Sequence, residues 1–500
     1  MNLRTRLSDL PHHFQLIVIG GGITGAGIVA EAARRGLRAL LVERNDFASG
    51  TSSWSSKLVH GGLRYLAGGH WRLTLESVRE RNRLLRERAG LVELQPFLMP
   101  VYRDSRPGLR TLRTGLAVYD LMGGQWRSRA LSARRALALE PGLRRDGLIG
   151  AVAYDDARTD DARLTLQLIF EAAAAGAQCL NYVAALALLR QGERVVGVRL
   201  RDAEDGSECE LGADVVINAV GATRDAFEGA AVGAPLLRPL RGSHLIFPLN
   251  KLPVRRAVSW LHPRDRRPVF VYPWLGVALC GTTDVDQAAD LEPHISEAEA
   301  DYLIEALAHQ FPLAGLQLAD AQASYAGVRP IVAGGGGDPS AESRESALWQ
   351  APGYVGITGG KLTTFRLTAQ HVLRAAVAQS PALAEAERTA QPTHPEMPSP
   401  ATQCAAWIAA QPADERVSLG GTPYSCAALR WSARHEQVRH LDDLLMRRSR
   451  LSLLLPQGGA ELLDDLASIC QEELGWDAAR WQQECAHYRQ LWQRLHAIGE

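Results

Sequence analysis

Lysine is rare in this chain, and one of its three lysines lies where a positive charge could serve chemistry. Lysine and arginine together number 55, so arginine supplies nearly all of the positive charge. Lys361 follows two glycines, Gly359 and Gly360, and precedes a run of hydroxyl and apolar residues. An ammonium group is a compact charge with three donors, whereas a guanidinium group is a planar fork, so the two are not interchangeable in a binding site. The composition therefore marks Lys361 as a candidate functional residue.

A second group of reactive side chains lies between residues 51 and 65. It combines Lys57 with several serine hydroxyls, His60, Arg64 and Tyr65. Hydroxyls and cations at this density suit an anionic ligand, but hydroxyls also cap helices. A phosphate-binding role and a structural role therefore both fit Lys57. The third lysine, Lys251, precedes a Leu-Pro pair and indicates a turn.

The elements that must position these side chains begin with a βαβ unit. Residues 14–19 form a short apolar run typical of a strand buried on both faces, residues 28–35 an alanine-rich helix, and residues 37–42 a second strand. The glycines of residues 20–25 fit G-x-G-x-x-G, which lets backbone amides approach a pyrophosphate at a helix N-terminus. Glu43 ends the second strand, where a carboxylate accepts hydrogen bonds from an adenosine ribose. The pattern predicts dinucleotide binding.

Two later segments favour FAD over NAD. Residues 214–221 form a buried strand that runs into Gly221, and FAD-binding folds of this type typically close the cofactor with such a late strand. Residues 353–360 form a strand that ends on paired glycines. A helix N-terminus can approach a flavin ring there and stabilise negative charge on it. The expected cofactor is FAD.

With these motifs in place, the chain resembles the flavin-dependent glycerol-3-phosphate dehydrogenases of the aerobic, quinone-reducing type. The resemblance runs from about residue 14 to residue 366 and continues more faintly through the tail. The segments that carry it are residues 19–27, 51–66, 160–163, 242–244, 281–284, 327–330 and 359–366. The chain departs from the family pattern at Val29, Glu31, Arg241 and Phe365, and over residues 339–348 and 405–418. The two longer departures put the local edge of the site and the role of the tail in question.

The resemblance implies an α/β (overall α+β) fold, with a Rossmann-like FAD-binding domain of the glutathione-reductase/D-amino-acid-oxidase type. A mixed-sheet substrate (cap) domain and a C-terminal helical domain complete it. The expected FAD-dependent region covers residues 13–390, with cofactor-binding parts at about 13–80, 145–232 and 325–390 and substrate parts at about 81–144 and 233–324. A proline-rich linker at 391–400 precedes a helical domain at 401–500.

The implied reaction removes a hydride from C2 of sn-glycerol 3-phosphate to flavin N5 while a base takes the hydroxyl proton, giving dihydroxyacetone phosphate. A phosphate dianion needs cationic partners, and the resemblance assigns Arg64, Arg329 and Lys361 to the substrate. His244 is the preferred proton acceptor because imidazole titrates near working pH, although a structural role and alkoxide stabilisation by Arg329 or Lys361 stay open. The expected catalytic residues are His244, Arg329 and Lys361. The expected substrate-binding residues are Arg64, Tyr65, Thr283, Asp284, Arg329 and Lys361.

The resemblance also implies a set of cofactor-binding residues. These are Gly20, Gly22, Gly25, Glu43, Arg44, Ser52, Ser53, Ser55, Ser56, Lys57, His60, Gly61, Gly221, Gly359, Gly360, Leu362 and Thr363. For Ser55 and Ser56, helix capping fits as well as contact with the pyrophosphate.

Bulk composition limits the partners and the location. The formal net charge is zero, which argues against a nucleic-acid binder that depends on a positive field. Seven dispersed cysteines without a CxxC pair indicate reduced thiols in the cytosol, with neither a disulfide framework nor a metal site. No run of 18 apolar residues and no signal-peptide pattern is found.

The arginine- and leucine-rich stretch at 103–122 fits peripheral contact with the inner face of the cytoplasmic membrane, where a quinone would take the electrons. A homodimer is left open.

Three other functions compete with this interpretation. An oxidase of the same fold would pass electrons to oxygen and make peroxide. An amine or amino-acid oxidase would need a carboxylate-binding arginine and an apolar cage in place of phosphate-binding cations. An inactive flavin-binding paralogue is the third alternative, and the divergent stretches at 339–348 and 405–418 keep it open.

Overall fold

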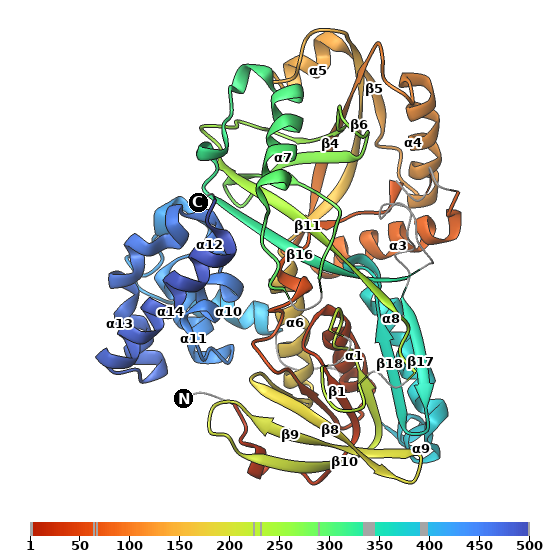
Figure 1. The fold of residues 1–500 in the computed structure, drawn as a ribbon, viewed down its shortest axis with the longest axis vertical. Coiled ribbons are helices and arrows are strands. Elements are labelled where there is room, and N and C mark those ends of the chain that lie inside the picture. Colours follow the sequence, from red (N-terminus) through yellow and green to blue (C-terminus); the bar gives the residue numbers. More distant parts are fainter. Residues whose placement is uncertain are drawn as a thin grey trace.

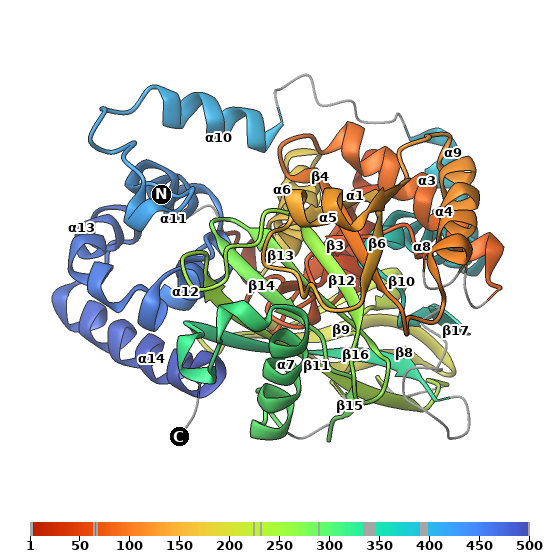
Figure 2. The same cartoon turned by 90° about the horizontal axis from the view of Figure 1, so that it is seen from above.

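The computed structural model describes residues 4–63, 66, 69–223, 226–230, 233–288, 291–333, 346–390 and 399–498. They form two β-sheets stacked along the long axis of the molecule, with a helical domain packed against their side (Figure 1). Seen from above, this helical domain covers one flank of the two-sheet body (Figure 2). The architecture confirms the predicted fold class.

The first sheet is built around parallel strands that the sequence marks by apolar runs. Its order is β17 (Ala347–Ala351), β18 (Tyr354–Thr358), β10 (Glu208–Asn218), β1 (His13–Ile19), β2 (Ala39–Val42) and β7 (Gln178–Leu180). β8 (Val183–Gln191) and β9 (Arg194–Asp202) extend it as an antiparallel hairpin beside β10. β1 pairs in parallel with both β2 and β10, so its side chains are buried on both faces.

Three helices cover this sheet, and glycines allow one of them to pack closely. They are α1 (Ile23–Arg34), α6 (Asp161–Ala174) and α8 (Phe365–Gln379), followed by α9 (Pro381–Thr389). Gly20 has φ of +113°, a conformation that a residue with a side chain rarely adopts. A Cβ on Gly25 would lie 1.9 Å from the carbonyl oxygen of Gly20. The turn between β1 and α1 therefore requires glycine at both positions.

The second sheet is mixed and larger. Its main path is β15 (Val285–Asp286), β11 (Leu237–Pro248), β14 (Val277–Gly281), β13 (Pro268–Trp274), β12 (Ala257–Leu261), β4 (Val92–Tyr102), β6 (Leu148–Thr159) and β3 (Leu58–Val59). β16 (Ala323–Val332) pairs with β11, and β5 (Arg129–Ser132) pairs with β6. Helices α3 (Trp71–Glu87), α4 (Leu109–Gly123), α5 (Ala133–Leu139) and α7 (Glu297–Gln310) accompany it. β6 and β16 thus lie in this sheet, although the expected cofactor-binding ranges include both.

The C-terminal part is helical, as predicted. It contains α10 (Pro400–Ala409), α11 (Cys426–His435), a π-helical turn (Asp443–Arg448), α12 (Leu451–Leu454), α13 (Leu463–Leu474) and α14 (Ala478–His496). Its apolar residues join those of the second sheet in one continuous core, in which Trp492 and Leu453 belong to the same cluster as Tyr325 and Trp274. The helical part is therefore packed firmly on the body of the molecule, and α10, at the top of Figure 2, lies against α11 and α6.

Candidate functional site

Two cavities meet where the sheets approach each other. The first has a volume of about 460 Å³ and follows the carboxyl ends of β1, β2 and β10. The second, of about 680 Å³, lies against the second sheet. Both are lined by Thr51, Trp54, Ser55, Pro330, Gly360, Lys361 and Leu362. The two cavities therefore share a junction, and Lys361 stands in it.

The first cavity offers the groups that a dinucleotide requires. Gly20 and Gly22 line it at the N-terminus of α1, where backbone amides and the helix dipole attract a pyrophosphate. The carboxylate of Glu43 accepts hydrogen bonds from the backbone amides of Gly21 at 2.7 Å and Asn45 at 3.0 Å. These bonds hold Glu43 in the wall of the cavity, and Arg44 lies beside it at the exposed rim. The residues present fit a dinucleotide cofactor such as the expected FAD.

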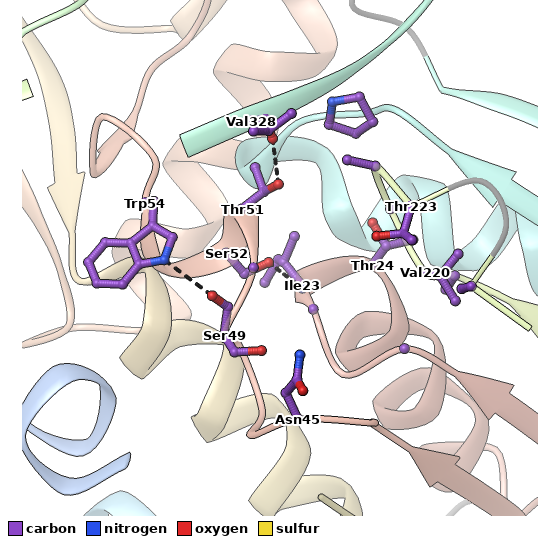
Figure 3. A pocket seen from close by; sticks show the side chains of 18 of the residues that line it. Ile23, Thr24, Asn45, Ser49, Thr51, Ser52, Trp54, Val220, Thr223 and Val328 are labelled. Carbon is purple, nitrogen blue, oxygen red and sulfur yellow. Dashed lines mark hydrogen bonds between the residues drawn. The ribbon is translucent and has the colours of Figure 1, made fainter. Parts of the chain in front are cut away.

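The segment after residue 50 is held between α1 and β16. The amide of Ile23 donates to the hydroxyl of Ser52 at 2.8 Å, and the hydroxyl of Thr51 donates to the carbonyl of Val328 at 2.5 Å (Figure 3). Because Ser52 thereby occupies a free donor of the first helical turn, it anchors the segment to the helix N-terminus. Trp54 projects beyond it at the junction (Figure 3).

Glycines at the ends of β10 and β18 also line the cavities near the junction. Gly359 and Gly360 have φ of +74° and +87°, and Gly221 has +74°. The hydroxyl of Thr358 donates to the carbonyl of Gly221 at 3.0 Å, which ties the end of β18 to the end of β10. A short helical turn beginning after Lys361 then leads into α8. The predicted approach of a helix N-terminus to the junction is present.

Arg329 of β16 lines the second cavity. Its guanidinium donates to the carboxylate of Asp284 at 2.9 Å and to the hydroxyl of Thr282 at 3.1 Å. It lies directly over Gly242, where a Cβ would come within 2.2 Å of its Nη2. Ser56, His60 and Thr363 line the same cavity. The structure therefore brings Arg329 and Lys361 to one cavity, as the sequence predicts.

His244 lies behind this cavity and not in its wall. Its side chain is 1 % exposed, stacks on Tyr325 with ring centroids 4.5 Å apart, and is covered by Gly281. Burial, with Arg329 and Lys57 nearby, holds the pKa of His244 well below its usual range. Its Nε2 lies 3.0 Å from the hydroxyl of Ser56, which does line the cavity. Strands β11, β14 and β16 bury its ring, so His244 reaches the cavity only through Ser56, and its role as proton acceptor stays a prediction.

Thr283 and Asp284 are likewise not wall residues. The hydroxyl of Thr283 donates to Glu299 at 2.6 Å and accepts from the amide of Ser243 at 2.9 Å, and the side chain is buried. Its neighbour Thr282 lines the cavity instead. Asp284 acts on the site through Arg329, whose guanidinium it holds.

Four expected cofactor-binding residues are buried outside both linings. Ser53 donates its hydroxyl to the carbonyl of Ala48 at 2.6 Å. Gly61 packs under Tyr119, and Gly25 under Gly20. Lys57 has no exposed side chain and donates to the carboxylate of Asp161 at 2.9 Å and to the carbonyl of Ser53 at 2.7 Å. Burial and the nearby Arg450 lower the pKa of Lys57 to about 8. These residues lie behind the cavity walls and pack against them. The position of Lys57 therefore favours a structural role over phosphate binding.

The remaining expected residues line one or both cavities, except for two that lie outside the described residues. Arg64 and Tyr65 lie outside the described residues, as does most of the divergent stretch at 339–348. The other divergent stretch, residues 405–418, falls on the end of α10 and the largely exposed loop after it. It is therefore remote from both cavities.

Sequence reasoning missed Asp156, which lines the second cavity from β6. Its carboxylate accepts from Arg81 at 3.0 Å and from the amide of Gly61 at 3.0 Å, and Tyr119 lies beside it. Burial raises the pKa of Asp156, and Arg81 opposes that shift. Two acidic residues in an otherwise apolar strand, residues 150–157, are the signal that marks it.

Known proteins resemble this chain over nearly its whole length. The family model "FAD dependent oxidoreductase" matches residues 15–375, and "C-terminal domain of alpha-glycerophosphate oxidase" matches residues 399–481. Glycerol-3-phosphate dehydrogenase 2 of Mycobacterium tuberculosis is 34 % identical over 519 residues, which cover 95 % of this chain and 87 % of that protein. The aerobic glycerol-3-phosphate dehydrogenase of Bacillus subtilis is 37 % identical over 367 residues, covering 72 % of this chain and 66 % of that protein.

Two solved structures show the same fold. The glycerol-3-phosphate dehydrogenase from Bacillus halodurans, complexed with FAD, superposes with a TM-score of 0.74 and 25 % identity over 97 % of this chain and 95 % of that one. The FAD-bound L-alpha-glycerophosphate oxidase of Mycoplasma pneumoniae gives a TM-score of 0.58 at 18 % identity, covering 73 % of this chain and 95 % of that one. The second likeness concerns the fold alone.

Proposed function

The chain belongs to the family of FAD-dependent glycerol-3-phosphate dehydrogenases, and from this premise we propose which residues carry out the reaction. FAD is the cofactor, and glycerol 3-phosphate is the substrate that is oxidised to dihydroxyacetone phosphate. Membership of this family favours the oxidation of glycerol 3-phosphate over that of an amine or amino acid, and the flavin titration below tests for an inactive paralogue.

The first cavity is proposed to bind the cofactor and the second to bind the substrate. Gly20, Gly22 and Glu43 would hold the pyrophosphate and adenosine ribose of FAD in the first cavity. The flavin, when bound, supplies the acceptor for the hydride that leaves C2 of the substrate. Gly360 and Lys361 line the junction through which the two cavities communicate. The substrate belongs in the second cavity, next to this junction.

Cations of the second cavity recognise the phosphate of the substrate. Arg329 is held by Asp284 and Thr282, so its guanidinium is already oriented before a ligand binds. Lys361 adds a compact ammonium group to the lining of the same cavity. Arg64, which the family resemblance assigns to the same role, lies outside the described residues.

The hydroxyl proton of the substrate leaves through Ser56. The Ser56 hydroxyl lies in the cavity wall and His244 lies 3.0 Å behind it, so Ser56 passes its own proton to Nε2 as it takes the one from the substrate. The lowered pKa of His244 leaves its imidazole neutral and able to accept this proton, but the same burial and the nearby Arg329 and Lys57 make it a weaker base than an exposed histidine.

The position of Lys361 in the walls of both cavities is the observation that carries this proposal. The test is anaerobic titration of the purified yellow protein with glycerol 3-phosphate, followed by flavin absorbance. We expect the flavin band to bleach, and glycerol without the phosphate to leave it unchanged. A flavin that stays oxidised in excess glycerol 3-phosphate would overturn the proposal.

A quinone at a membrane surface is the proposed electron acceptor. Within the described residues no helix has the length and apolar character needed to cross a membrane. Exposed apolar side chains on and after α4 support peripheral contact, because Leu121 is 66 % and Trp126 73 % exposed next to Arg127. Sedimentation with anionic lipid vesicles should carry the protein down, and Leu121→Glu with Trp126→Glu should release it. Equal sedimentation of the variant would remove this surface from the proposal.

Oxygen is the second candidate acceptor, since the family model matching residues 399–481 carries the description of an oxidase. Peroxide measured during turnover in air distinguishes the two acceptors. We expect little peroxide and rapid reduction of a soluble quinone analogue. One peroxide per substrate oxidised, with no quinone reduction, would make the protein an oxidase.

A further inference from the structure

Three arginines of the C-terminal helical domain are buried against the cofactor-binding part of the chain. Arg447 and Arg448 end the π-helical turn and Arg450 lies two residues beyond it, and their side chains are 5 %, 0 % and 0 % exposed. A buried guanidinium must be paired with carboxylates to be tolerated. Here the principal partners are Asp46, Asp160 and Asp161, which lie 289 or more residues away along the chain.

Arg450 reaches the wall shared by the two cavities through a single carboxylate. Its guanidinium donates to Asp160 at 2.8 Å and to Oδ1 of Asp161 at 2.6 Å. The other oxygen of Asp161 accepts from the amide of Ser55 at 2.9 Å and from its hydroxyl at 2.7 Å. Since Ser55 lines both cavities, only Asp161 separates this arginine from the cofactor site.

Arg447 and Arg448 act in the same way on the turn after β2. Both donate to Asp46, with Nη2 of Arg448 at 2.9 Å from Oδ1. Burial alone would raise the pKa of Asp46, but the two guanidinium groups overcome this effect and lower it. Asp46 closely follows Glu43, whose carboxylate faces the first cavity. The arginine cluster therefore supports both cofactor-facing turns from behind.

Charge balance distinguishes this arrangement from ordinary domain docking. Behind Ser55, the carboxylates of Asp160 and Asp161 are matched by Lys57 and Arg450. Without Arg450, two buried carboxylates would face one ammonium group, and an excess negative charge would lie beside a cavity that must accept a pyrophosphate. Arg163 also joins the domains, through Glu436 at 2.6 Å, yet neither side chain lines a cavity.

We propose that the C-terminal helical domain is a working part of the FAD site, in which Arg450 positions Ser55 through Asp161 while Arg447 and Arg448 position the Glu43–Asp46 turn through Asp46. This inference rests on FAD as the cofactor and goes beyond the proposed reaction. Arg450 is a positioning residue, because it acts through Asp161 and touches neither cavity itself.

The test is the affinity of the apoprotein for FAD, measured by fluorescence quenching as FAD is added back. Arg450→Lys keeps the charge but loses the fork that spans Asp160 and Asp161. We expect FAD binding to weaken by roughly tenfold, the size of effect expected from one charge-assisted hydrogen bond. Arg450→Met should weaken it further. Arg163→Met is the matched control, since it breaks an ion pair between the same domains, and it should leave FAD affinity unchanged.

A double-mutant cycle keeps the proposal testable if Arg450→Met does not fold. Ser55→Ala removes the far end of the connection and leaves the ion pairs intact. If Arg450 acts through Ser55, the effects of Arg450→Lys and Ser55→Ala on FAD affinity will be less than additive. The proposal would be overturned if the two substitutions had fully additive effects on FAD affinity, or if a folded Arg450→Lys protein bound FAD with unchanged affinity. No substrate is needed, so a failure of glycerol 3-phosphate to bleach the flavin would count against the proposed reaction alone.

Discussion

Nε2 of the buried His244 lies 3.0 Å from the hydroxyl of Ser56, which lines the second cavity. The histidine is thus one hydroxyl away from the substrate position. Tyr272 and Tyr325 hold the segment in place by donating to the carbonyls of Ser56 and Ser55, both at 2.8 Å. The pair has the geometry of a short proton path.

Loss of either member of this pair should slow turnover without weakening substrate binding. Because a positioned proton acceptor contributes roughly 100-fold or more to a rate, we expect kcat to fall by about that factor in His244→Gln and in Ser56→Ala. KM for glycerol 3-phosphate should change little, since neither residue is proposed to bind the phosphate. The double variant should be no slower than the slower single variant. A Ser56→Ala protein with normal kcat would place the acceptor elsewhere, and the histidines that line the second cavity are His60, His262 and His309.

A methyl group on Gly242 should disturb Arg329 specifically. The new Cβ would lie 2.2 Å from Nη2 of Arg329, so the flexible guanidinium must move away from its partners. We expect Gly242→Ala to raise KM for glycerol 3-phosphate by roughly tenfold, as the loss of a charge-assisted contact would. FAD content should stay normal. Gly108→Ala is the control, because its Cβ would meet no atom within 4 Å. If steady-state kinetics show the same KM for both variants, Arg329 does not bind the substrate.

Local patterns predicted the cofactor-binding half of the molecule well, because its determinants are local. The apolar strand β1, the glycines that follow it and Glu43 lie within one βαβ unit. Lys361 was found for the same reason, since its glycine neighbours form the junction directly.

The sequence could not place residues whose position depends on strand pairing. Thr282 and Thr283 follow the end of β14, where successive side chains point to opposite faces. The pairing of β14 in the sheet therefore determines that Thr282, and not Thr283, faces the cavity. His244 is buried because β11 lies between β14 and β16, which no pattern around residue 244 reveals. The pairing of Arg450 with Asp161 joins positions 289 residues apart. Such contacts become visible only once the chain is folded.

Lys361 and Lys251 give a matched test of the requirement for an ammonium group. Lys361 lines both cavities, whereas Lys251 lies on the surface and pairs with Asp320 at 2.7 Å. A guanidinium is longer and planar, so Lys361→Arg should fold and bind FAD but lose roughly tenfold or more in kcat/KM. Lys251→Arg should be unchanged in both respects. A fully active Lys361→Arg enzyme would show that any cation suffices at the junction.

The pH dependence of stability should reveal the ion pairs of His440, which connects α14 to the β9–β10 turn. Its Nδ1 lies 3.0 Å from Glu484, and its Nε2 lies 3.6 Å from Glu204. Burial lowers the pKa of His440, but the two carboxylates overcome this effect and raise it from 6.5 to about 10. The folded chain thus keeps a proton that the unfolded chain loses above pH 6.5. The stabilisation is complete below that pH and disappears as the pH rises through about 10.

His440→Gln should therefore lower the unfolding temperature most at pH 6 and progressively less as the pH approaches 10. Thermal unfolding followed by circular dichroism at a series of pH values measures the difference between the two proteins. His294→Gln serves as the control, because His294 is exposed, and its curve should follow that of the unmodified protein. A difference between His440→Gln and the unmodified protein that stays constant across this pH range would mean that His440 stabilises the domain contact by packing, for instance against Tyr182, and not by its charge.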